Sequence, residues 1–346
     1  MARTVPPAVN APAPWQKLLA ECRSAPGAAQ RDNLEEETRA ALQQDICADL
    51  SSWTPLAVRG EDARDFLRRM LTSTVTKVGP RQSELSAWCK TDGRVRCILI
   101  LLELRGTLHL ALPRELAAAA GEELRRFILR SRVGIEDRGE TVARMGLAGD
   151  GAPARVARYF GTAPEAPWET ASGDAGTAVR LPGSRPRFFL AGDAAALAAL
   201  WREGRDELRS VGAQAWALLD ILAGLPWIGE RSSGAYLPQM LDLLRLGALD
   251  LQKGCFPGQE IVVRVHHRGT LKQRLYRVAA PVPLQPGDGL RAAEEETVAG
   301  TVINAAPSPD GGAALAVVRI AAAGRRRLQL ERDARIEVAL HEAGAK

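Results

Sequence analysis

The chain has 346 residues, 46% hydrophobic and 25% charged, the composition of a globular protein with room for two or three domains. No apolar run approaches the roughly 18 residues that span a bilayer, and the N-terminal residues lack the apolar segment of a secretory signal, so we expect a cytoplasmic protein without a membrane anchor. The net charge of +5 attracts polyanions in general, but the only tight basic run is residues 325–327, which favours arginines scattered over solvated faces.

The cysteines do not follow the pattern of a disulfide framework or a zinc site. Their number is odd, and no C-x-x-C pair occurs among Cys22, Cys47, Cys89, Cys97 and Cys255. Of the four histidines, two are adjacent, at His266 and His267. We therefore expect no bound metal, and we expect Cys89 and Cys97, which lie in strand-like segments, to belong to the core.

The first third of the chain has the pattern of an α+β domain, and we predict that this domain spans residues 31–145. Residues 1–30 are rich in proline and alanine and are expected to form a disordered or loosely attached tail. Asp92 and Gly93 separate two apolar runs, which is the favoured signal for a two-residue hairpin turn. The predicted elements are a strand at 56–59, a helix at 63–70, strands at 86–89, 95–104 and 107–112, and a helix at 115–130. This order predicts a sheet with helices packed on one side.

Two further domains follow. A second α+β domain is set at 146–270, because residues 188–194 repeat the strand, glycine and Asp-Ala helix start of residues 56–63, as a duplicated domain would. From residue 271 short strands alternate with turn residues, which is typical of a small β-barrel, and this third domain is set at 271–346. Its predicted strands are residues 275–278, 298–303, 314–320 and 335–340.

The most informative segment is residues 253–260, with the sequence K-G-C-F-P-G-Q-E. Pro257 and Gly258 favour a turn, and the residues from Gln259 onward can form a helix. Cys255 is therefore expected just before a helix N-terminus.

Several neighbours bear on the chemistry of this cysteine. The helix dipole and the nearby Lys253 would both stabilise a thiolate, whereas Glu260 would oppose it or accept a hydrogen bond from a ligand. Gly254 allows the backbone to approach a ligand closely. On these grounds alone a reactive thiol and a small buried side chain are equally compatible with Cys255.

The same octapeptide resembles the K-G-C-[YF]-x-G-Q-E signature of the YgfZ family. Residues 236–243, Y-L-P-Q-M-L-D-L, are similar to the P-Q-M-x-x-L segment before that signature, and residues 58–67 resemble the family's G-x-D-A-x-x-F-L start. Trp88 and residues 93–95 resemble its hairpin. The resemblance extends from about residue 50 to about residue 340, and on it the chain is identified as a YgfZ-type protein of the aminomethyltransferase (GcvT)-like superfamily.

This resemblance implies a fold and a function. The implied fold class is α+β, with two related ferredoxin-like, aminomethyltransferase-type domains and a C-terminal antiparallel β-barrel in a cloverleaf around a folate-binding channel. The implied function is that of a folate-binding accessory factor that maintains [4Fe–4S] enzymes, including enzymes that thiolate tRNA. The expected cofactor is tetrahydrofolate, with or without a polyglutamate tail, and the expected partners are iron–sulfur client enzymes. We expect a monomer that binds neither membranes nor nucleic acid directly.

The resemblance also implies which residues act. Cys255 and Lys253 are expected to carry the chemistry, and a reduced folate is expected between the two α+β domains. The residues expected to contact it are Trp88, Gly254, Gly258, Gln259, Glu260 and Arg264. Two positions depart from the family's pattern: Thr74 stands where the family has Asp in L-T-[SN]-D-V, and Asp220 where it has Arg in R-x-x-x-G-[IL]-P. If either polar group touches folate or orders the channel, folate binding would differ here.

Two alternative functions remain open. A folate-dependent aminomethyltransferase shares the implied fold, but it needs an Asp near the folate, and Asp92, the only carboxylate in the matching hairpin, has the context of a turn residue. A basic RNA-binding module would use the barrel as its platform. Tyr276 is, however, the only aromatic residue from position 271 onward, so the aromatic and basic strand pattern is missing.

Overall fold

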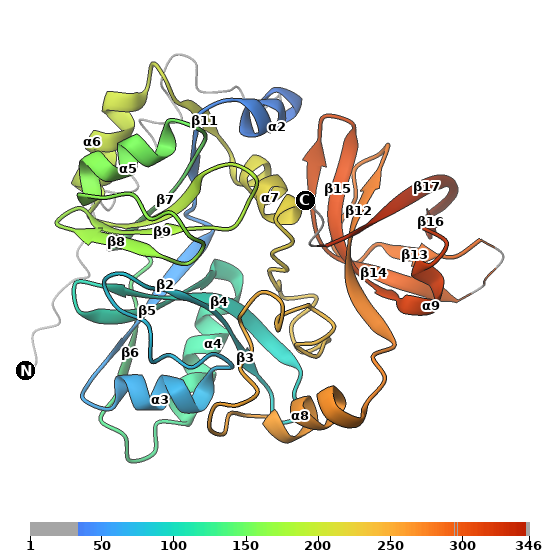
Figure 1. Cartoon of the computed structure of the whole chain (residues 1–346), viewed down its shortest axis with the longest axis horizontal. Helices are drawn as coiled ribbons and strands as arrows, with labels where there is room; N and C mark the ends of the chain where they lie inside the picture. The colour runs from blue at the N-terminus through green and yellow to red at the C-terminus, as the bar shows by residue number, and fades with distance from the viewer. Residues whose placement is uncertain (1–33, 294, 296, 344–346) are drawn as a thin grey trace, which may run out of the picture.

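The computed structural model describes residues 34–293, 295 and 297–343, so the predicted tail and Cys22 lie outside the described residues. Within the described part, two sheets and a closed barrel surround an irregular segment that joins them (Figure 1). That segment, residues 223–258, contains no regular helix or strand and lies between the first sheet and the barrel.

The first sheet has five antiparallel strands in the order β3-β4-β5-β2-β6. Its elements are β2 (Trp53–Arg59), α3 (Ala63–Met70), β3 (Glu84–Cys89), β4 (Val95–Leu104), β5 (Thr107–Pro113), α4 (Arg114–Arg126) and β6 (Gly134–Asp137). The hairpin between β3 and β4 turns at Gly93, whose φ of +79° lies in the left-handed region that glycine adopts without strain. The predicted β-α-β-β-β-α order is confirmed, with β6 added at the sheet edge.

The second sheet has six strands in the order β11-β1-β7-β10-β9-β8. Its strands are β1 (Ile46–Asp49), β7 (Ala143–Ala148), β8 (Thr170–Gly173), β9 (Gly176–Arg180), β10 (Arg187–Gly192) and β11 (Arg209–Val211). Its helices are α2 (Leu34–Gln43), α5 (Ala152–Phe160), α6 (Ala194–Gly204) and α7 (Ala213–Leu222). Strand β1 pairs with β7 and β11, although it precedes the whole first sheet in the chain. The predicted domain boundary at residue 145 stays a prediction. Strand β1 precedes this boundary in the sequence but belongs to the second sheet.

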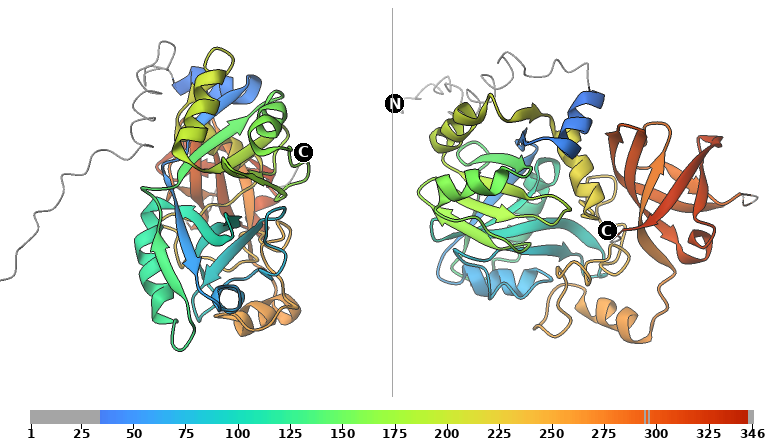
Figure 2. Two further views of the ribbon diagram at one scale, coloured as in Figure 1. Left: turned by 90° about the vertical axis from the view of Figure 1, so that its left-hand side faces the viewer. Right: turned by 45° about the horizontal axis from the view of Figure 1, so that its top comes forward.

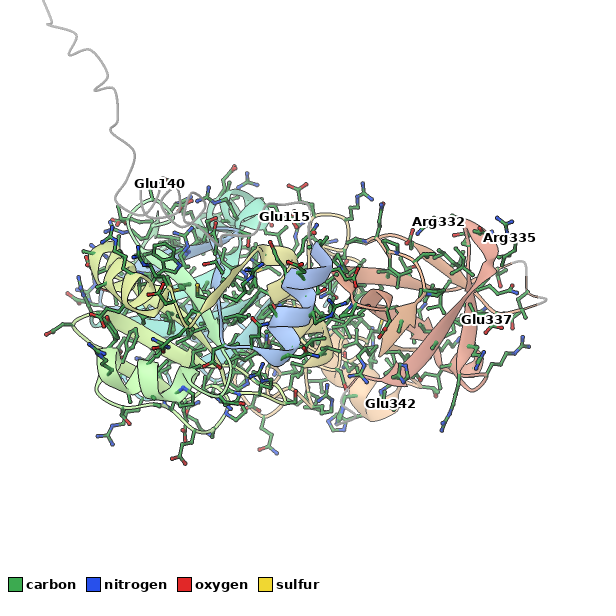
Figure 3. The ribbon with its side chains drawn as sticks, turned by 90° about the horizontal axis from the view of Figure 1, so that it is seen from above. Glu115, Glu140, Arg332, Arg335, Glu337 and Glu342 are labelled. Carbon is green, nitrogen blue, oxygen red and sulfur yellow. The ribbon has the colours of Figure 1, made fainter. Side chains whose placement is uncertain are left out.

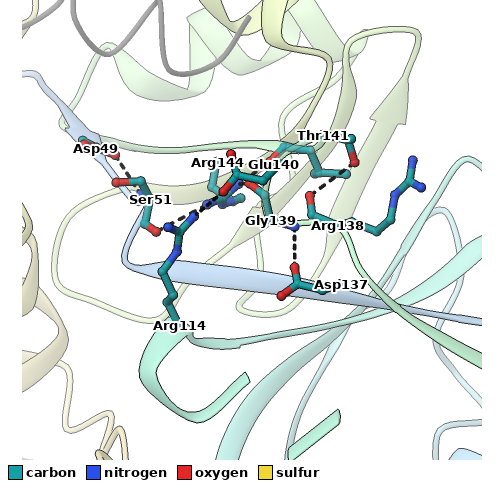
Figure 4. A network of polar contacts seen from close by, with 10 residues as sticks. Asp49, Ser51, Arg114, Asp137, Arg138, Gly139, Glu140, Thr141 and Arg144 are labelled. Atoms are coloured by element: carbon teal, nitrogen blue, oxygen red, sulfur yellow. Dashed lines mark hydrogen bonds and ion pairs between the residues drawn. The ribbon is translucent and has the colours of Figure 1, made fainter. Parts of the chain in front are cut away.

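The backbone therefore crosses between the two sheets twice, and one arginine holds both crossings (Figure 4). Arg144 on β7 is fully buried, and its guanidinium donates to the carbonyls of Gly139 and Val142, each at 2.5 Å, in the second crossing. It also donates to the carbonyl of Ser51 in the first crossing, at 3.3 Å. Burial lowers the pKa of Arg144 to about 10. These hydrogen bonds to carbonyl oxygens offset much of the free-energy cost of burying the Arg144 cation.

The two sheets share one apolar layer. Side chains from the first sheet, Ile100 and Leu102, belong to the same buried cluster as Phe189 and Ala191 from the second. Trp53 lies in the same cluster and meets the Phe189 ring edge-on at a centroid distance of 5.8 Å. Figure 2 shows the two sheets one above the other, with the barrel beside them.

The C-terminal barrel closes through six strands in the order β12-β15-β14-β13-β16-β17. It follows α8 (Gln259–Arg268), and its elements are β12 (Gln273–Ala280), β13 (Gly289–Arg291), β14 (Val298–Ser308), β15 (Gly311–Arg319), α9 (Ile320–Ala323), β16 (Arg327–Leu330) and β17 (Asp333–Glu342). Strand β14 packs against α7, which joins the barrel to the second sheet. Charged side chains of both signs, among them Arg332, Arg335, Glu337 and Glu342, cover its outside (Figure 3).

Candidate functional site

The K-G-C-F-P-G-Q-E segment lies against the tip of the β3–β4 hairpin. Gly258 is the residue before α8, and its φ of +77° is in the left-handed region. A Cβ added at Gly258 would lie 2.4 Å from the Cα and N of Gly93 and from the carbonyl oxygen of Lys90. Only glycine allows this backbone-to-backbone approach. The expected role of Gly258 as a folate contact stays a prediction; its observed contact is with the hairpin.

Lys253 is held by the C-terminal end of α3. Its ammonium donates to the carbonyl of Arg68 at 2.5 Å and also to the carbonyl of Leu71, which are groups that a helix end leaves without partners. The Nζ atom lies 5.4 Å from the centroid of the Phe256 ring. Burial, with a smaller effect from the Arg68 charge, lowers the pKa of Lys253 to about 8. This ammonium can therefore release a proton close to neutral pH.

Cys255 differs from the other cysteines that the structure describes. Cys47, Cys89 and Cys97 are buried, whereas Cys255 is exposed. Burial raises the pKa of Cys47 to about 11 and that of Cys97 to about 12, and it raises the pKa of Cys89 further. The expectation that Cys89 and Cys97 belong to the core is confirmed. The interpretation of Cys255 as a small buried side chain is wrong.

The remaining residues of the segment close a loop around the thiol. The Gln259 side chain donates to the carbonyl of Lys253 at 3.1 Å, which ties the start of α8 back to the start of the segment. Gly254 is exposed, and a Cβ there would lie 3.4 Å from the Arg68 guanidinium. Glu260 and Arg264 are exposed on α8, and neither side chain has a hydrogen bond or ion pair to another described residue. Both side chains are free to meet a ligand or solvent.

Trp88 lies on the same hairpin but is buried. It is 3% exposed within the core of the first sheet, so a pterin could stack on its ring only if its packing neighbours moved. Its indole N–H is a buried donor that lacks a hydrogen-bond partner among the described residues. The amide oxygen of Gln239 is a buried acceptor in the same condition, while its amide nitrogen donates to the carbonyl of Val262 on α8 at 2.6 Å. Buried polar atoms are seldom left without partners.

These two atoms lie on segments that are hydrogen-bonded to each other. Gly234 donates to the carbonyl of Val95 at the start of β4, and Val95 donates to the carbonyl of Tyr236, three residues before Gln239. A pterin carries both donors and acceptors, so a buried donor and a buried acceptor suit its edge. The two unpartnered buried atoms are therefore of the donor and acceptor types that a pterin edge can use.

The structure gathers the predicted site on one side of the molecule. Residues 253–260 contact α3 and the β3–β4 hairpin, both from the first domain. Among the described residues, this segment has no hydrogen bond or ion pair to the second sheet, which the sequence prediction made one wall of the folate channel. Sequence reasoning did not find Arg68, because it lies 185 positions from Lys253 and carries no local motif.

Both departures from the family's pattern have partners in the fold. The Thr74 hydroxyl donates to the Glu84 carboxylate at 3.0 Å, and the same carboxylate accepts from the backbone N–H of Val75 at 2.9 Å. Asp220 is buried and accepts from the Arg187 guanidinium at 2.7 Å. At both positions the present residue completes a contact inside the protein.

The described residues contain neither a cluster of metal ligands nor a membrane-spanning helix. No group of three or more His, Cys, Asp and Glu side chains there is arranged to hold a metal ion. No helix in the same part of the chain has the length and apolarity needed to cross a membrane.

Comparisons with known proteins agree with this architecture. A family model described as the GCVT N-terminal domain matches residues 12–170. The crystal structure of glycine cleavage system aminomethyltransferase T from Bartonella henselae aligns with a TM-score of 0.78 at 18% identity, over 96% of each chain. The fold is that of an aminomethyltransferase. The α+β fold class with a C-terminal β-barrel is thereby confirmed, and the two findings support a place in the GcvT-like superfamily.

A second solved structure is much less similar. Heterotetrameric sarcosine oxidase from Corynebacterium sp. U-96, in complex with pyrrole 2-carboxylate, aligns with a TM-score of 0.35 at 13% identity. The alignment covers 55% of this chain and 94% of that chain, and the similarity is weak.

Proposed function

We propose that this protein is a YgfZ-type, folate-binding accessory factor that maintains [4Fe–4S] enzymes in the cytoplasm, including enzymes that thiolate tRNA, with Cys255 as its key residue. The exposure of Cys255 carries the proposal, because the other described cysteines are buried with raised pKa values. A thiol must reach its substrate and ionise before it can act as a nucleophile. Cys255 is the described cysteine that meets the first of these conditions.

The surroundings of the thiol support a chemical role. The main chain holds Lys253 next to it, with the ammonium fixed by two carbonyls at the end of α3. Because burial lowers the pKa of Lys253 to about 8, its ammonium can release or accept a proton in the physiological range, two residues along the chain from Cys255. Gln259 and Gly258 fix the loop that presents both side chains.

Tetrahydrofolate is the proposed cofactor. When bound, a reduced folate supplies a carrier for one-carbon units. Trp88 and Gln239 would offer it a buried donor and a buried acceptor, and Glu260 an exposed carboxylate near the thiol. Arg264, exposed one turn further along α8, would meet the anionic glutamate tail.

A folate-dependent aminomethyltransferase is the second candidate, favoured by the fold. Such an enzyme requires a carboxylate aimed at the folate. In the matching hairpin Asp92 accepts a hydrogen bond from the backbone of Arg94 at 3.1 Å and pairs with Lys90 at 3.2 Å. It is thus engaged as a turn residue, which favours the accessory function.

Two variants and one titration test the proposal. Cells that lack the protein receive the wild type, Cys255→Ala or Cys255→Ser, and the activity of a [4Fe–4S] tRNA-thiolating enzyme is measured. We expect both variants to fold and to bind tetrahydrofolate in calorimetry like the wild type, yet to lose the rescue. Full rescue by Cys255→Ala would refute the role of the thiol.

The calorimetry decides the cofactor separately. A wild type that rescues the cells but binds no tetrahydrofolate would remove folate from the proposal and leave the thiol. An aminomethyl transfer that survives in Cys255→Ala but stops in Asp92→Asn would favour the second candidate.

A further inference from the structure

The loop after α4 presents two apolar side chains to solvent. Phe127 is 43% exposed and Leu129 is 87% exposed, and Arg130 follows them, also exposed. We call Phe127, Leu129 and Arg130 the loop patch. Leu129 is the most exposed of the large hydrophobic side chains in the described part of the chain. Exposing such side chains to water is unfavourable unless another surface covers them.

The loop patch is held in place by its neighbours. Ile128, between the two exposed residues, packs against the core of the first sheet, as does Val133 further along. The backbone N–H of Arg132 donates to the Asp62 carboxylate at 2.7 Å. Gly60, with φ of +115°, approaches so closely that an added Cβ would lie 1.9 Å from the carbonyl oxygen of Arg132. With the loop fixed from both sides, its apolar side chains point outward on a rigid base.

Helix α3 connects the loop patch to the thiol. The Arg69 guanidinium on α3 donates to the hydroxyl of Ser131 at 3.0 Å. The carbonyl of the preceding residue on α3, Arg68, accepts from Lys253, two residues before Cys255. In Figure 1 the loop after α4, α3 and the segment before α8 lie along one edge of the molecule. Hydrogen bonds through α3 thus link the loop that carries the exposed apolar side chains to the segment that carries the exposed thiol.

This edge of the molecule carries an excess of positive charge. Arg68 and Arg69 share a single carboxylate, that of Asp65, and Arg130 has no ion-pair partner among the described residues. Lys253 adds a further cation at the end of α3, held by carbonyls rather than by a carboxylate. Arg132 does not add to this excess of positive charge, because it pairs with the carboxylates of Glu61 and Asp62. An acidic partner surface would complement the charge that remains.

We infer that the loop patch and the exposed face of α3 form the docking surface for a protein partner with an acidic rim and an apolar pocket. This inference rests on the proposed function, and the partner is then the iron–sulfur enzyme that Cys255 serves. Phe127 and Leu129 enter the apolar pocket, and the arginines meet the acidic rim. Docking there places the partner over Cys255, because α3 links the two sites.

Binding of the full chain to a purified [4Fe–4S] tRNA-thiolating enzyme tests the inference. The double variant Phe127→Ser/Leu129→Ser should raise the Kd at least about tenfold, as the loss of a small apolar anchor does. The matched control is Val298→Ser/Ile320→Ser, which makes the same kind of change at barrel residues that are 40% and 41% exposed, and it should leave the Kd unchanged. Arg130→Glu should slow association and reduce the salt dependence of binding.

Three results would overturn the inference. One is an unchanged Kd for Phe127→Ser/Leu129→Ser in a variant that unfolds at the wild-type temperature. Another is no binding of the enzyme by the wild type. The third is binding of the wild type, through the same two residues, to phosphatidylglycerol vesicles but not to the enzyme, which would make the patch a membrane contact. None of these depends on the Cys255→Ala rescue or on the tetrahydrofolate titration, so the docking surface can fail while the proposed function stands.

Discussion

The buried ion pair between Asp220 and Arg187 gives the sharpest stability prediction. It joins α7 to β10, and the two side chains are only 5% and 2% exposed. Arg187 also donates to the carbonyl of Pro182 at 2.6 Å and lies 5.5 Å from the centroid of the Trp216 ring. Burial raises the pKa of Asp220, and the Arg187 charge opposes that rise. Each charge thus depends on the other for its stability in the interior.

Removing one partner should cost far more than removing both. Asp220→Ala leaves the Arg187 cation buried and unpaired, and a loss of about 3–5 kcal/mol is typical of that change. The double variant Asp220→Leu/Arg187→Met removes both charges and should come close to wild-type stability. Asp220→Arg, which restores the residue of the resembled family, sets two guanidinium groups together and should destabilise at least as much as Asp220→Ala.

The assay is urea unfolding followed by tryptophan fluorescence, and the single variants Asp220→Leu and Arg187→Met form one thermodynamic cycle with their double variant. Trp216, which lies beside Arg187, is one of the seven tryptophans that contribute to this signal. Stability of Asp220→Ala within about 1 kcal/mol of wild type would refute the reasoning, because it would mean that Arg187 finds other compensation. A double variant as unstable as the single one would show that packing, not charge, dominates at this position.

Three further predictions concern pH, packing and reactivity. Burial lowers the pKa of His109 to about 4, so between about pH 6.5 and pH 4 the unfolded chain binds more protons than the folded chain, and stability falls as the pH falls. Urea unfolding at pH 7 and pH 5 should differ by about 2 kcal/mol from this group, and His109→Gln should remove that difference. Gly258→Ala should destabilise more than Gly247→Ala, because both residues have φ above +60° but only Gly258 meets backbone within 4 Å; equal unfolding midpoints would contradict this. Competitive alkylation with peptide mapping should label Cys255 faster than Cys47, Cys89 and Cys97, since these three are buried; equal rates would count against an accessible thiol.

Local signals in the sequence predicted much of the fold. The Asp-Gly pair predicts the β3–β4 hairpin correctly, because Gly93 adopts the positive φ that such a turn requires. Four predicted barrel strands correspond to β12, β14, β15 and β17. Strands β13 and β16 were not predicted, because with 3 and 4 residues they are too short to show an alternating pattern.

Contacts between distant positions could not be predicted from the sequence. Strand β1 lies near the start of the described chain yet pairs with β11, 163 residues later, and no local pattern specifies that partner. Likewise, the sequence placed Lys253 near Cys255 but could not show that α3 holds its ammonium. The burial of Trp88 has the same cause, since its packing neighbours come from several parts of the chain.

The two departures from the family's pattern indicate how this chain keeps its fold while its polar residues change. An Asp at position 74, as in the family, would place a second carboxylate against Glu84. The Thr74 hydroxyl instead donates to Glu84, whose other carboxylate oxygen accepts from the backbone N–H of Val75. Val75 is buried with a φ of 64°, a conformation that is strained for a β-branched residue and needs such support. At position 220 a carboxylate is required because Arg187 is already present. Both substitutions are therefore explained by neighbours inside the protein, and neither residue has to touch folate to account for its identity.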